Sequence, residues 1–326
     1  MTFPGPLLCA DVSESLHIEK EPVEMTESHR SYANLHLHST HSDGVYSPAE
    51  LARIAFDEGY RAIALTDHDT VTGNPEAKAE CERLGMGFIF GAEFSVAKPD
   101  TFHIVGFDFD PEYPPMAEYL RMMGERETHQ TREIFYMAEK TGGISGITWD
   151  EVLEYNEGVA WLCNNHVFRA MKAKGLLREE DYMDFFQRNY RKQRSMIPPL
   201  HPFKTTAEIL ELIRNAGGIS VLAHPAPPWG TAGDILRLAE LGLDGVEVRH
   251  PHVPAEEQPK IRAIAAKLGL YVSGGSDHSG LCGGYYSSFH SEDELKASGF
   301  YIPPCEAGAS EEEFDRLRLR RRPEQV

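Results

Sequence analysis

Six apolar, strand-prone runs in the chain end on, or lead directly into, a histidine, an aspartate or a glutamate, and a seventh ends more weakly. The side chains at these ends are His36, His38, His68, Glu93, His103, His224 and Asp277, with Asp43 just beyond the first run. Imidazole and carboxylate are the groups that hold Zn, Mn or Fe in proteins. Because these donors are spread from residue 36 to residue 277, they can form one polynuclear metal site only if the fold brings them together.

An α/β barrel would bring these donors together, because the carboxyl ends of its parallel strands gather at one mouth. The sequence predicts strands at 33–38, 61–67, 87–92, 102–107, 219–223, 245–249 and 270–275. Ser47-Pro48-Ala49-Glu50 predicts a helix start with Ser47 as the cap and Glu50 closing a capping box, and Gly59 ends this helix. The alternation of strand and helix predicts a parallel sheet joined by right-handed crossovers.

Composition divides the chain into four parts. Residues 1–30 are predicted to be a polar leader, 31–110 and 201–305 the barrel, 111–200 a mostly helical insertion that covers the C-terminal mouth, and 306–326 a charged C-terminal tail. The insertion is predicted because Met, Glu, Arg and Lys recur at helical spacing there and strand-like runs are scarce. The run Arg320-Arg321-Arg322 in the tail is most simply a solvated end.

The net charge of −19 argues against a nucleic-acid scaffold that works through a basic surface. It allows an anionic small substrate, because bound divalent metals reverse the local field. The five cysteines are dispersed and contain no C-x-x-C pair, which argues against a disulfide framework. No stretch approaches the roughly 20 apolar residues of a membrane span. We therefore expect a soluble, cytoplasmic protein with no membrane partner and no stable nucleic-acid partner; the oligomeric state stays open.

The order of the motifs indicates a family. His36-x-His38 places two imidazoles on one face of a strand, because side chains alternate with period two, but this pair alone is weak evidence. The whole series reads His36-Leu-His38-Ser-Thr-His41-Ser-Asp43-Gly, Thr66-Asp67-His68-Asp69, Gly91-Ala-Glu93, Ala223-His224-Pro225 and Gly275-Ser276-Asp277. This series resembles the PHP (polymerase and histidinol phosphatase) family, and in particular its stand-alone bacterial metal-dependent phosphoesterases that carry a helical insertion.

The resemblance implies a distorted (β/α)7 barrel, in line with the seven predicted strands, with two or three divalent metal ions (Mn, Zn or Fe) at its C-terminal mouth. The implied ligands are His36, His38, Glu93 and Asp277 for one metal, Glu93 as a bridge with His103 and His224 for a second, and Asp43 and His68 for a third. A water between two bridged cations becomes a hydroxide near neutral pH, and this hydroxide would attack phosphorus in line.

Two departures from the family pattern bear on the site. The final motif usually reads Ser-Asp-x-His, whereas here Ser279 stands at the histidine position and His278 comes one residue early. Either His278 reaches the third metal, or only two metals bind. In the insertion the family commonly shows Arg-x-His-x-x-x-Arg; here Asn164 replaces the first Arg, while His166 and Arg169 remain.

The predicted catalytic residues are His166, Asp277 and His278. His166 is a candidate for a third-metal contact, a phosphate hydrogen bond or general acid to the leaving oxygen, and the alternative is a helix-face histidine packed in the cover. The predicted phosphate-binding residues are His166, Arg169, Arg191, Lys192, Arg194 and His201. A solvated helix face is the alternative for the basic run. Glu247 and His250 end the sixth strand and can line the pocket, but neither they nor His252 are predicted ligands.

These expectations predict a metal-dependent phosphoesterase that acts on a small phosphorylated metabolite. The substrate would be a nucleotide bisphosphate, the end of a short oligonucleotide or a phosphorylated ribose, including a cyclic phosphodiester. A histidinol-phosphate-type phosphatase and an amidohydrolase-type C–N hydrolase are the alternatives. A degenerate structural PHP domain has the weakest support, because the donor residues are intact and the chain leaves no room for a polymerase.

Overall fold

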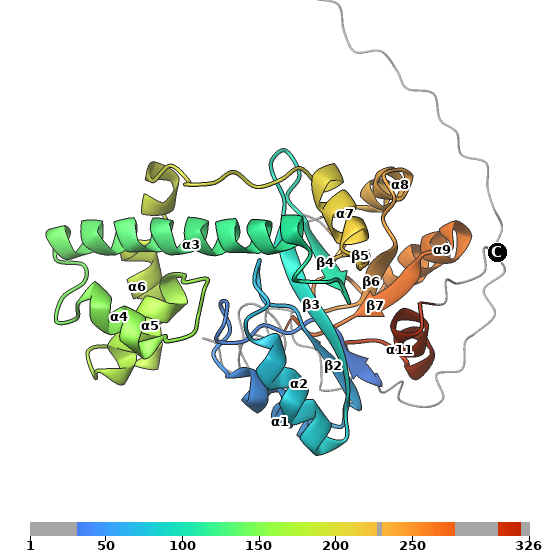
Figure 1. Ribbon diagram of the computed structural model, residues 1–326, viewed down its shortest axis with the longest axis horizontal. Coiled ribbons are helices and arrows are strands. Elements are labelled where there is room, and N and C mark those ends of the chain that lie inside the picture. The colour runs from blue at the N-terminus through green and yellow to red at the C-terminus, as the bar shows by residue number, and fades with distance from the viewer. Residues whose placement is uncertain (1–30, 227–229, 278–305, 321–326) are drawn as a thin grey trace, which may run out of the picture.

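The computed structural model describes residues 31–226, 230–277 and 306–320 and contains a seven-stranded sheet in the order β1-β2-β3-β4-β5-β6-β7. The strands are β1 (Ala33–Asn34), β2 (Ala62–Leu65), β3 (Gly87–Ser95), β4 (His103–Phe107), β5 (Ile219–Leu222), β6 (Gly245–Arg249) and β7 (Tyr271–Gly274). Every predicted strand is present, and the distorted, nearly closed barrel that was expected is confirmed (Figure 1).

Helices between the strands cover the outside of the barrel (Figure 1). They are α1 (Pro48–Glu58), α2 (Asn74–Leu84), α7 (Thr206–Asn215), α8 (Ala232–Glu240) and α9 (Gln258–Leu268). The predicted start of α1 is confirmed: Ser47 accepts from the Glu50 backbone, Glu50 reaches back to the Ser47 backbone, and Gly59 ends the helix with φ 105°.

The expected all-parallel sheet is wrong at one strand. β4 runs antiparallel to both β3 and β5, whereas the other pairs are parallel. The link 96–102 between β3 and β4 contains no helix, and a parallel connection needs a crossover of a dozen or more residues. Because β4 is reversed, the start of β4 lies beside the end of β3, where His103 pairs with Ser95. His103 therefore still lies at the mouth.

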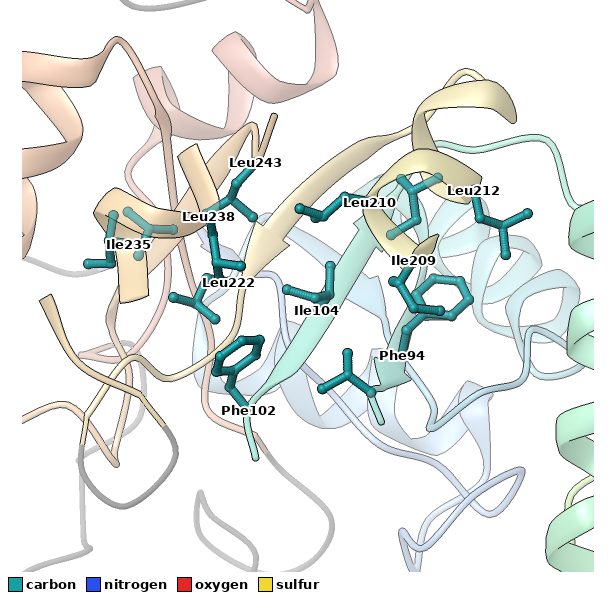
Figure 2. Packing of buried hydrophobic residues seen from close by; sticks show 14 of the residues in the cluster. Phe94, Phe102, Ile104, Ile209, Leu210, Leu212, Leu222, Ile235, Leu238 and Leu243 are labelled. Carbon is teal, nitrogen blue, oxygen red and sulfur yellow. The ribbon is translucent and has the colours of Figure 1, made fainter. Parts of the chain in front are cut away.

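The sheet-to-helix layer is the largest hydrophobic cluster. Figure 2 shows Phe94, Ile104 and Leu222 on the strands, with Phe102 just before β4, facing Ile209 and Leu210 of α7 and Ile235 and Leu238 of α8. All of these side chains are buried. Burial of each large apolar side chain stabilises the fold by roughly 1.5–3 kcal/mol. The layer therefore fixes the strands against the helices, and with them the side chains at the strand ends.

The barrel approaches closure where the chain after β1 meets the end of β7. Leu35 donates its N–H to the Gly274 carbonyl (3.1 Å), and Asp277 donates its N–H to the His36 carbonyl (3.0 Å). The Asn34 side chain donates to Ser276 Oγ (2.7 Å) and accepts from the Ser276 N–H (3.0 Å). This seam therefore places Asp277 beside His36.

Gly275 is required at the seam. A Cβ at this position would lie 2.3 Å from the Cβ and 2.4 Å from the backbone N of His36. We expect Gly275→Ala to destabilise the protein by about 1–3 kcal/mol, the usual penalty for overpacking, measured by urea unfolding. The control is Gly233→Ala in α8, where the nearest atom, Thr231 Oγ1, is 3.5 Å away; equal stability of the two variants would contradict the prediction.

The described part of the predicted C-terminal tail, residues 306–320, packs on the barrel and contains a charged helix. Helix α11 (Glu311–Arg318) buries Phe314 and Leu317 in a cluster with residues of β1 to β5 and β7, at the end opposite the mouth. Ala309 exchanges backbone hydrogen bonds with Ala33. Arg320, expected to be solvated, donates to the carboxylate of Asp108 (2.8 Å). Residues 321–326 and the leader 1–30 lie outside the described residues.

The predicted insertion forms a lobe with its own core. It contains α3 (Pro114–Thr141), α4 (Trp149–Tyr155), α5 (Asn164–Ala173), α6 (Tyr182–Asn189) and the short 3-10 helices η1 (Glu179–Asp181) and η2 (Gln193–Met196). Figure 1 shows α3 extending from the barrel and carrying α4 to α6 at its far end. A separate cluster that includes Phe135, Trp149 and Phe168 fills this lobe. Among the described residues no helix is long and apolar enough to cross a membrane.

Candidate metal centre

Glu93 lies at the middle of the mouth, and histidines surround both of its oxygens. Its Oε2 is 3.1 Å from His68 Nδ1, 3.3 Å from His38 Nε2 and 3.4 Å from His36 Nε2. Its Oε1 is 3.1 Å from His103 Nδ1 and 3.2 Å from His224 Nε2. One buried carboxylate therefore faces two separate groups of imidazoles, which is the arrangement of a bridging ligand.

Asp277 adds a second carboxylate on the β1 side. Its Oδ1 lies 3.1 Å from His38 Nε2 and 3.7 Å from His36 Nε2. The Nε2 atoms of His36 and His38 are themselves 3.1 Å apart. Two imidazole nitrogens this close need a proton or a cation between them, because two lone pairs repel.

Asp43 and His68 lie at the side of the mouth that faces the insertion. Asp43 Oδ2 is 3.9 Å from His68 Nε2, and Asp43 Oδ1 is 3.7 Å from His38 Nδ1. The ring of Trp161, from the insertion, stacks on His68 with centroids 6.0 Å apart. Asp43 and His68 are thus together as predicted, and His68 is closer still to Glu93. His278, the remaining predicted ligand, lies outside the described residues.

The charges of the site are strongly coupled. Burial would raise the pKa of Glu93, but His103, His36 and His68 hold it well below its usual range. Burial would lower the pKa of His38, but Asp277, Glu93 and Asp43 outweigh this effect and raise it to about 10. Carboxylates that stay ionised in a buried site require compensating positive charge, from protonated histidines or from bound cations.

The spacing of the donors fits bound divalent metals. Two donors about 2.1 Å from a tetrahedral ion are about 3.4 Å from each other, close to the separations around both oxygens of Glu93. The buried atoms His38 Nδ1 and Asp43 Oδ1 have no hydrogen-bond partner in the described part of the chain. Imidazole and carboxylate without thiolate suit Zn, Mn and Fe.

Asp67 supports the loop that carries Asp43. Its carboxylate accepts from the Ser39 N–H (2.7 Å), the Ser39 hydroxyl (2.7 Å) and the Ser42 hydroxyl (2.5 Å), and all three residues are buried. Gly44 completes the tight turn, because a Cβ at this position would lie 2.1 Å from the His38 carbonyl oxygen. The loop after β1 is therefore fixed before any ligand binds.

His166 does not reach the donors. Its Nδ1 accepts from the Cys163 N–H (2.9 Å), so Nε2 carries the hydrogen and donates to the Thr40 carbonyl (3.0 Å). Both nitrogens are engaged, and neither is left for the predicted contact with a phosphate or a leaving oxygen. Burial, together with Arg169, lowers the pKa of His166 well below its usual value. In this structure His166 therefore holds the loop that carries Asp43, which fits the alternative of a histidine packed in the insertion.

Arg169, like His166, binds backbone carbonyls of the loop that carries Asp43. Its guanidinium donates to the Gly44 carbonyl and, at 3.2 Å, to the Thr40 carbonyl. In this structure the guanidinium is engaged by these two loop contacts rather than directed at the donor cluster. We expect Arg169→Leu to lower the free energy of unfolding by about 1–3 kcal/mol, because the buried Gly44 carbonyl loses its charged donor and the half-buried Thr40 carbonyl keeps only the donor from His166. Chemical denaturation measures this loss. Lys172→Leu, an exposed position on the same helix, should change stability by less than about 1 kcal/mol.

The remaining predicted phosphate-binding residues differ in their surroundings. Arg194 makes two 2.5 Å hydrogen bonds to the buried carboxylate of Glu127 on α3. His201 Nε2 lies 3.0 Å from Glu125 Oε2. Arg191 and Lys192 are exposed, and neither forms an ion pair within the described part of the chain. These last two are the cations most available to a ligand.

Three residues near β6 also lie at the centre, of which Glu247 and His250 were expected to line the pocket but none was predicted to be a ligand. Glu247 accepts from His36 Nδ1 (2.9 Å). His250 Nε2 and His252 Nδ1 each lie 3.7 Å from Asp277 Oδ2. His250 Nδ1 accepts from the His252 N–H (3.1 Å), so its Nε2 carries a hydrogen and is a donor rather than a metal ligand. The alternation of buried Val246 and Val248 with Glu247 was the available signal.

A seven-stranded barrel with imidazoles and carboxylates gathered at its mouth defines the class of metal-dependent barrel hydrolases. Residues 34–195 match the PHP domain model. A 3′,5′-nucleoside bisphosphate phosphatase of Chromobacterium violaceum is 30% identical, with 80% of this chain and 91% of that protein covered. A 5′-3′ exoribonuclease of Haemophilus influenzae is also 30% identical, covering 77% and 90%. A phosphoribosyl 1,2-cyclic phosphate 1,2-diphosphodiesterase of Eggerthella lenta is 25% identical, covering 77% and 95%.

Two solved structures are similar to this chain in fold and in sequence. A Bifidobacterium adolescentis protein assigned as a metal-dependent phosphoesterase has a TM-score of 0.65 and 27% identity, covering 82% of this chain and 95% of that one. A Chromobacterium violaceum amidohydrolase with bound sulfate has a TM-score of 0.62 and 27% identity, covering 84% and 98%. The chain belongs to the PHP family, and it is a hydrolase that acts on phosphoric ester bonds. The family resemblance found in the sequence is thereby confirmed.

Proposed function

We propose that this enzyme removes a phosphate from a nucleotide that carries a second phosphate, as a 3′,5′-bisphosphate or at the end of a short oligonucleotide. The single observation that supports it most is Glu93, whose two oxygens face two groups of histidines 3.1–3.4 Å away. The similarity to a bisphosphate phosphatase and to an exoribonuclease supports the substrate class.

Two or three Mn, Zn or Fe ions would be held by the predicted ligand sets. These are His36, His38, Glu93 and Asp277; Glu93, His103 and His224; and Asp43 with His68. When bound, such ions supply Lewis-acid charge to the phosphoryl oxygens and lower the pKa of water. The chain itself fixes the donors: Asp67 holds the Asp43 loop, and the seam holds Asp277 beside His36.

Charges in the insertion would select the substrate. Arg191 and Lys192 are exposed in the link between α6 and η2, and Arg194 is held in place by Glu127. Charge-assisted hydrogen bonds from these side chains to a second phosphate would orient the ester over the donor cluster. The two described cysteines, Cys81 and Cys163, are buried free thiols, which suits the reducing cytoplasm where such nucleotides occur.

Phosphate release from a panel of substrates tests this function. The panel contains adenosine 3′,5′-bisphosphate, a 5′-phosphorylated dinucleotide, a ribose cyclic phosphate, histidinol phosphate and, for the amidohydrolase alternative, N-acetyl amino acids. We expect Arg191→Gln with Lys192→Gln to raise KM for the bisphosphate about tenfold and to leave 4-nitrophenyl phosphate unchanged. The control is Lys260→Gln with Lys267→Gln on α9. Amide hydrolysis without phosphate release would overturn the proposal.

A further inference from the structure

Glu247 is a buried carboxylate in the middle of β6 with both oxygens engaged. Its exposed fraction is 0%, and the neighbouring Val246 and Val248 point to the helix layer, so Glu247 points into the barrel. Its Oε1 lies 2.9 Å from His36 Nδ1, and its Oε2 accepts the His224 backbone N–H at 2.8 Å. It thereby links β6 to one candidate ligand after β1 and to another after β5.

The contact with His36 determines which nitrogen can bind a metal. An ionised carboxylate only accepts hydrogen bonds, so His36 Nδ1 must carry the hydrogen. The lone pair of the metal-bound form is then on Nε2, the atom that faces Glu93, His38 and Asp277. A carboxylate behind a ligating histidine fixes its tautomer and ring orientation.

The contact with His224 acts on the backbone. His224 has φ 31°, in the left-handed region that residues other than glycine rarely adopt. Its N–H is held by Glu247, and its carbonyl accepts from the Ala226 N–H at 2.7 Å. These two bonds hold the strained turn in the conformation that directs the His224 ring, with Nε2 3.2 Å from Glu93 Oε1.

We propose that Glu247 is a positioning residue of the metal centre, which sets the His36 tautomer and the His224 turn at once and is not itself a ligand. This inference rests on the proposed metal-dependent function. It connects the two ligand groups on either side of Glu93, since His36 faces Oε2 and His224 faces Oε1. The Glu247 carboxylate therefore positions one ligand in each of the two histidine groups that face Glu93.

Glu247→Gln separates this role from simple packing, because glutamine has the same shape. If its amide oxygen faces His224, its NH2 faces His36 Nδ1 and selects the tautomer with hydrogen on Nε2, which blocks ligation. If the oxygen faces His36, the NH2 opposes the His224 N–H, donor against donor. In both arrangements one ligand is displaced, and outer-shell substitutions of this kind reduce metal affinity about 10- to 100-fold.

The test is Zn²⁺ affinity of the full chain, measured by competition with a chromogenic chelator. The matched control is Asp244→Asn, a carboxylate that accepts from Ser220 at the opposite end of the same strand pair. We expect Glu247→Gln to lose about 10- to 100-fold in Zn²⁺ affinity and Asp244→Asn to lose none. A ¹⁵N spectrum of the zinc-loaded protein should show His36 with hydrogen on Nδ1 in the wild type. In Glu247→Gln we expect either the loss of this signal or, if the amide oxygen faces His36, a change in the signals of His224.

A double-mutant cycle with His36→Gln tests whether Glu247 acts on metal binding through His36 rather than through the stability of the fold. Because Glu247 acts partly through His36, the losses of Zn²⁺ affinity caused by the two substitutions should be less than additive, and the remaining loss in the His36→Gln background reports the contact with His224. Should Glu247→Gln fail to fold, Glu247→Asp keeps the charge and is measured in its place, with the same expected direction. Wild-type affinity in a folded Glu247 variant would overturn this inference alone. Absence of Zn²⁺ binding by the wild type would overturn the proposed metal-dependent function itself.

Discussion

Replacing Glu93 by glutamine is expected to reduce phosphate-ester hydrolysis on the order of 10³-fold, because a Lewis-acid centre contributes several kcal/mol and each 1.4 kcal/mol is about tenfold. The amide keeps the shape of Glu93 but has one oxygen in place of two. The one remaining oxygen can act as a ligand on one side of the centre only. It replaces either the oxygen that faces His36, His38 and His68 or the oxygen that faces His103 and His224. Elemental analysis should show fewer bound metal ions per chain than in the wild type.

The control for Glu93→Gln is Glu80→Gln on α2. Glu80 is also a largely buried carboxylate, but its partners are Arg53 and Arg83 rather than histidines of the centre. This variant should hydrolyse the same substrates within about twofold of the wild type, since Glu80 contacts none of the donors and its two arginine partners are exposed, where ion pairs contribute little. A Glu93→Gln protein with full metal content and full activity would contradict the role of Glu93 as a ligand shared by two metal ions.

Removal of metal is expected to abolish hydrolysis and to lower stability together. A ligand present at 100 to 1,000 times its dissociation constant stabilises a folded protein by about 3–4 kcal/mol, and a chelator removes this contribution. Thermal unfolding of the chelated protein should therefore begin at a lower temperature, and addition of Mn²⁺, Zn²⁺ or Fe²⁺ should restore both properties. Activity that survives exhaustive chelation would contradict the metal requirement.

The affinity for metal should rise with pH. The carboxylates around His38 raise its pKa to about 10 after outweighing the effect of burial, and the pKa of His103 is raised as well. The metal-free site therefore binds protons at neutral pH, and a cation must displace them. Lowering the pH favours the protonated, metal-free form, and raising it favours the cation. Zinc titrations at pH 6, 7 and 8 check this direction by the protons released.

Local sequence signals were sufficient for most of the barrel. The apolar runs at 61–67, 87–92 and 245–249 predicted their strands because burial in a sheet selects such residues over several positions. Donors that follow such strands could also be predicted to meet. The direction of β4 was missed although the link 96–102 is too short for a helical crossover, a signal that the expected βα alternation overrode.

Long-range partners account for the other differences. Nothing local in the sequence indicates that His166 and Arg169 bind carbonyls of the loop 40–44, because that loop is far away along the chain. Glu247 reads as one acidic residue among apolar neighbours, and its role depends on His36 and His224. Side-chain identity predicted the chemistry of the centre, whereas hydrogen-bond partners across the barrel decide which residues contact a ligand and which hold others in place.

The seam between the chain after β1 and the end of β7 has a consequence for folding. Asn34 and Ser276, which bond across it, are separated by 242 positions in the sequence. Contacts of such long range form late, since the entropy of closing the intervening chain must be overcome first. The pairing of His36 with Asp277 depends on the same closure. A ribosome must therefore release nearly the whole barrel before the centre can assemble, so a nascent or truncated chain that ends before β7 cannot acquire the complete site.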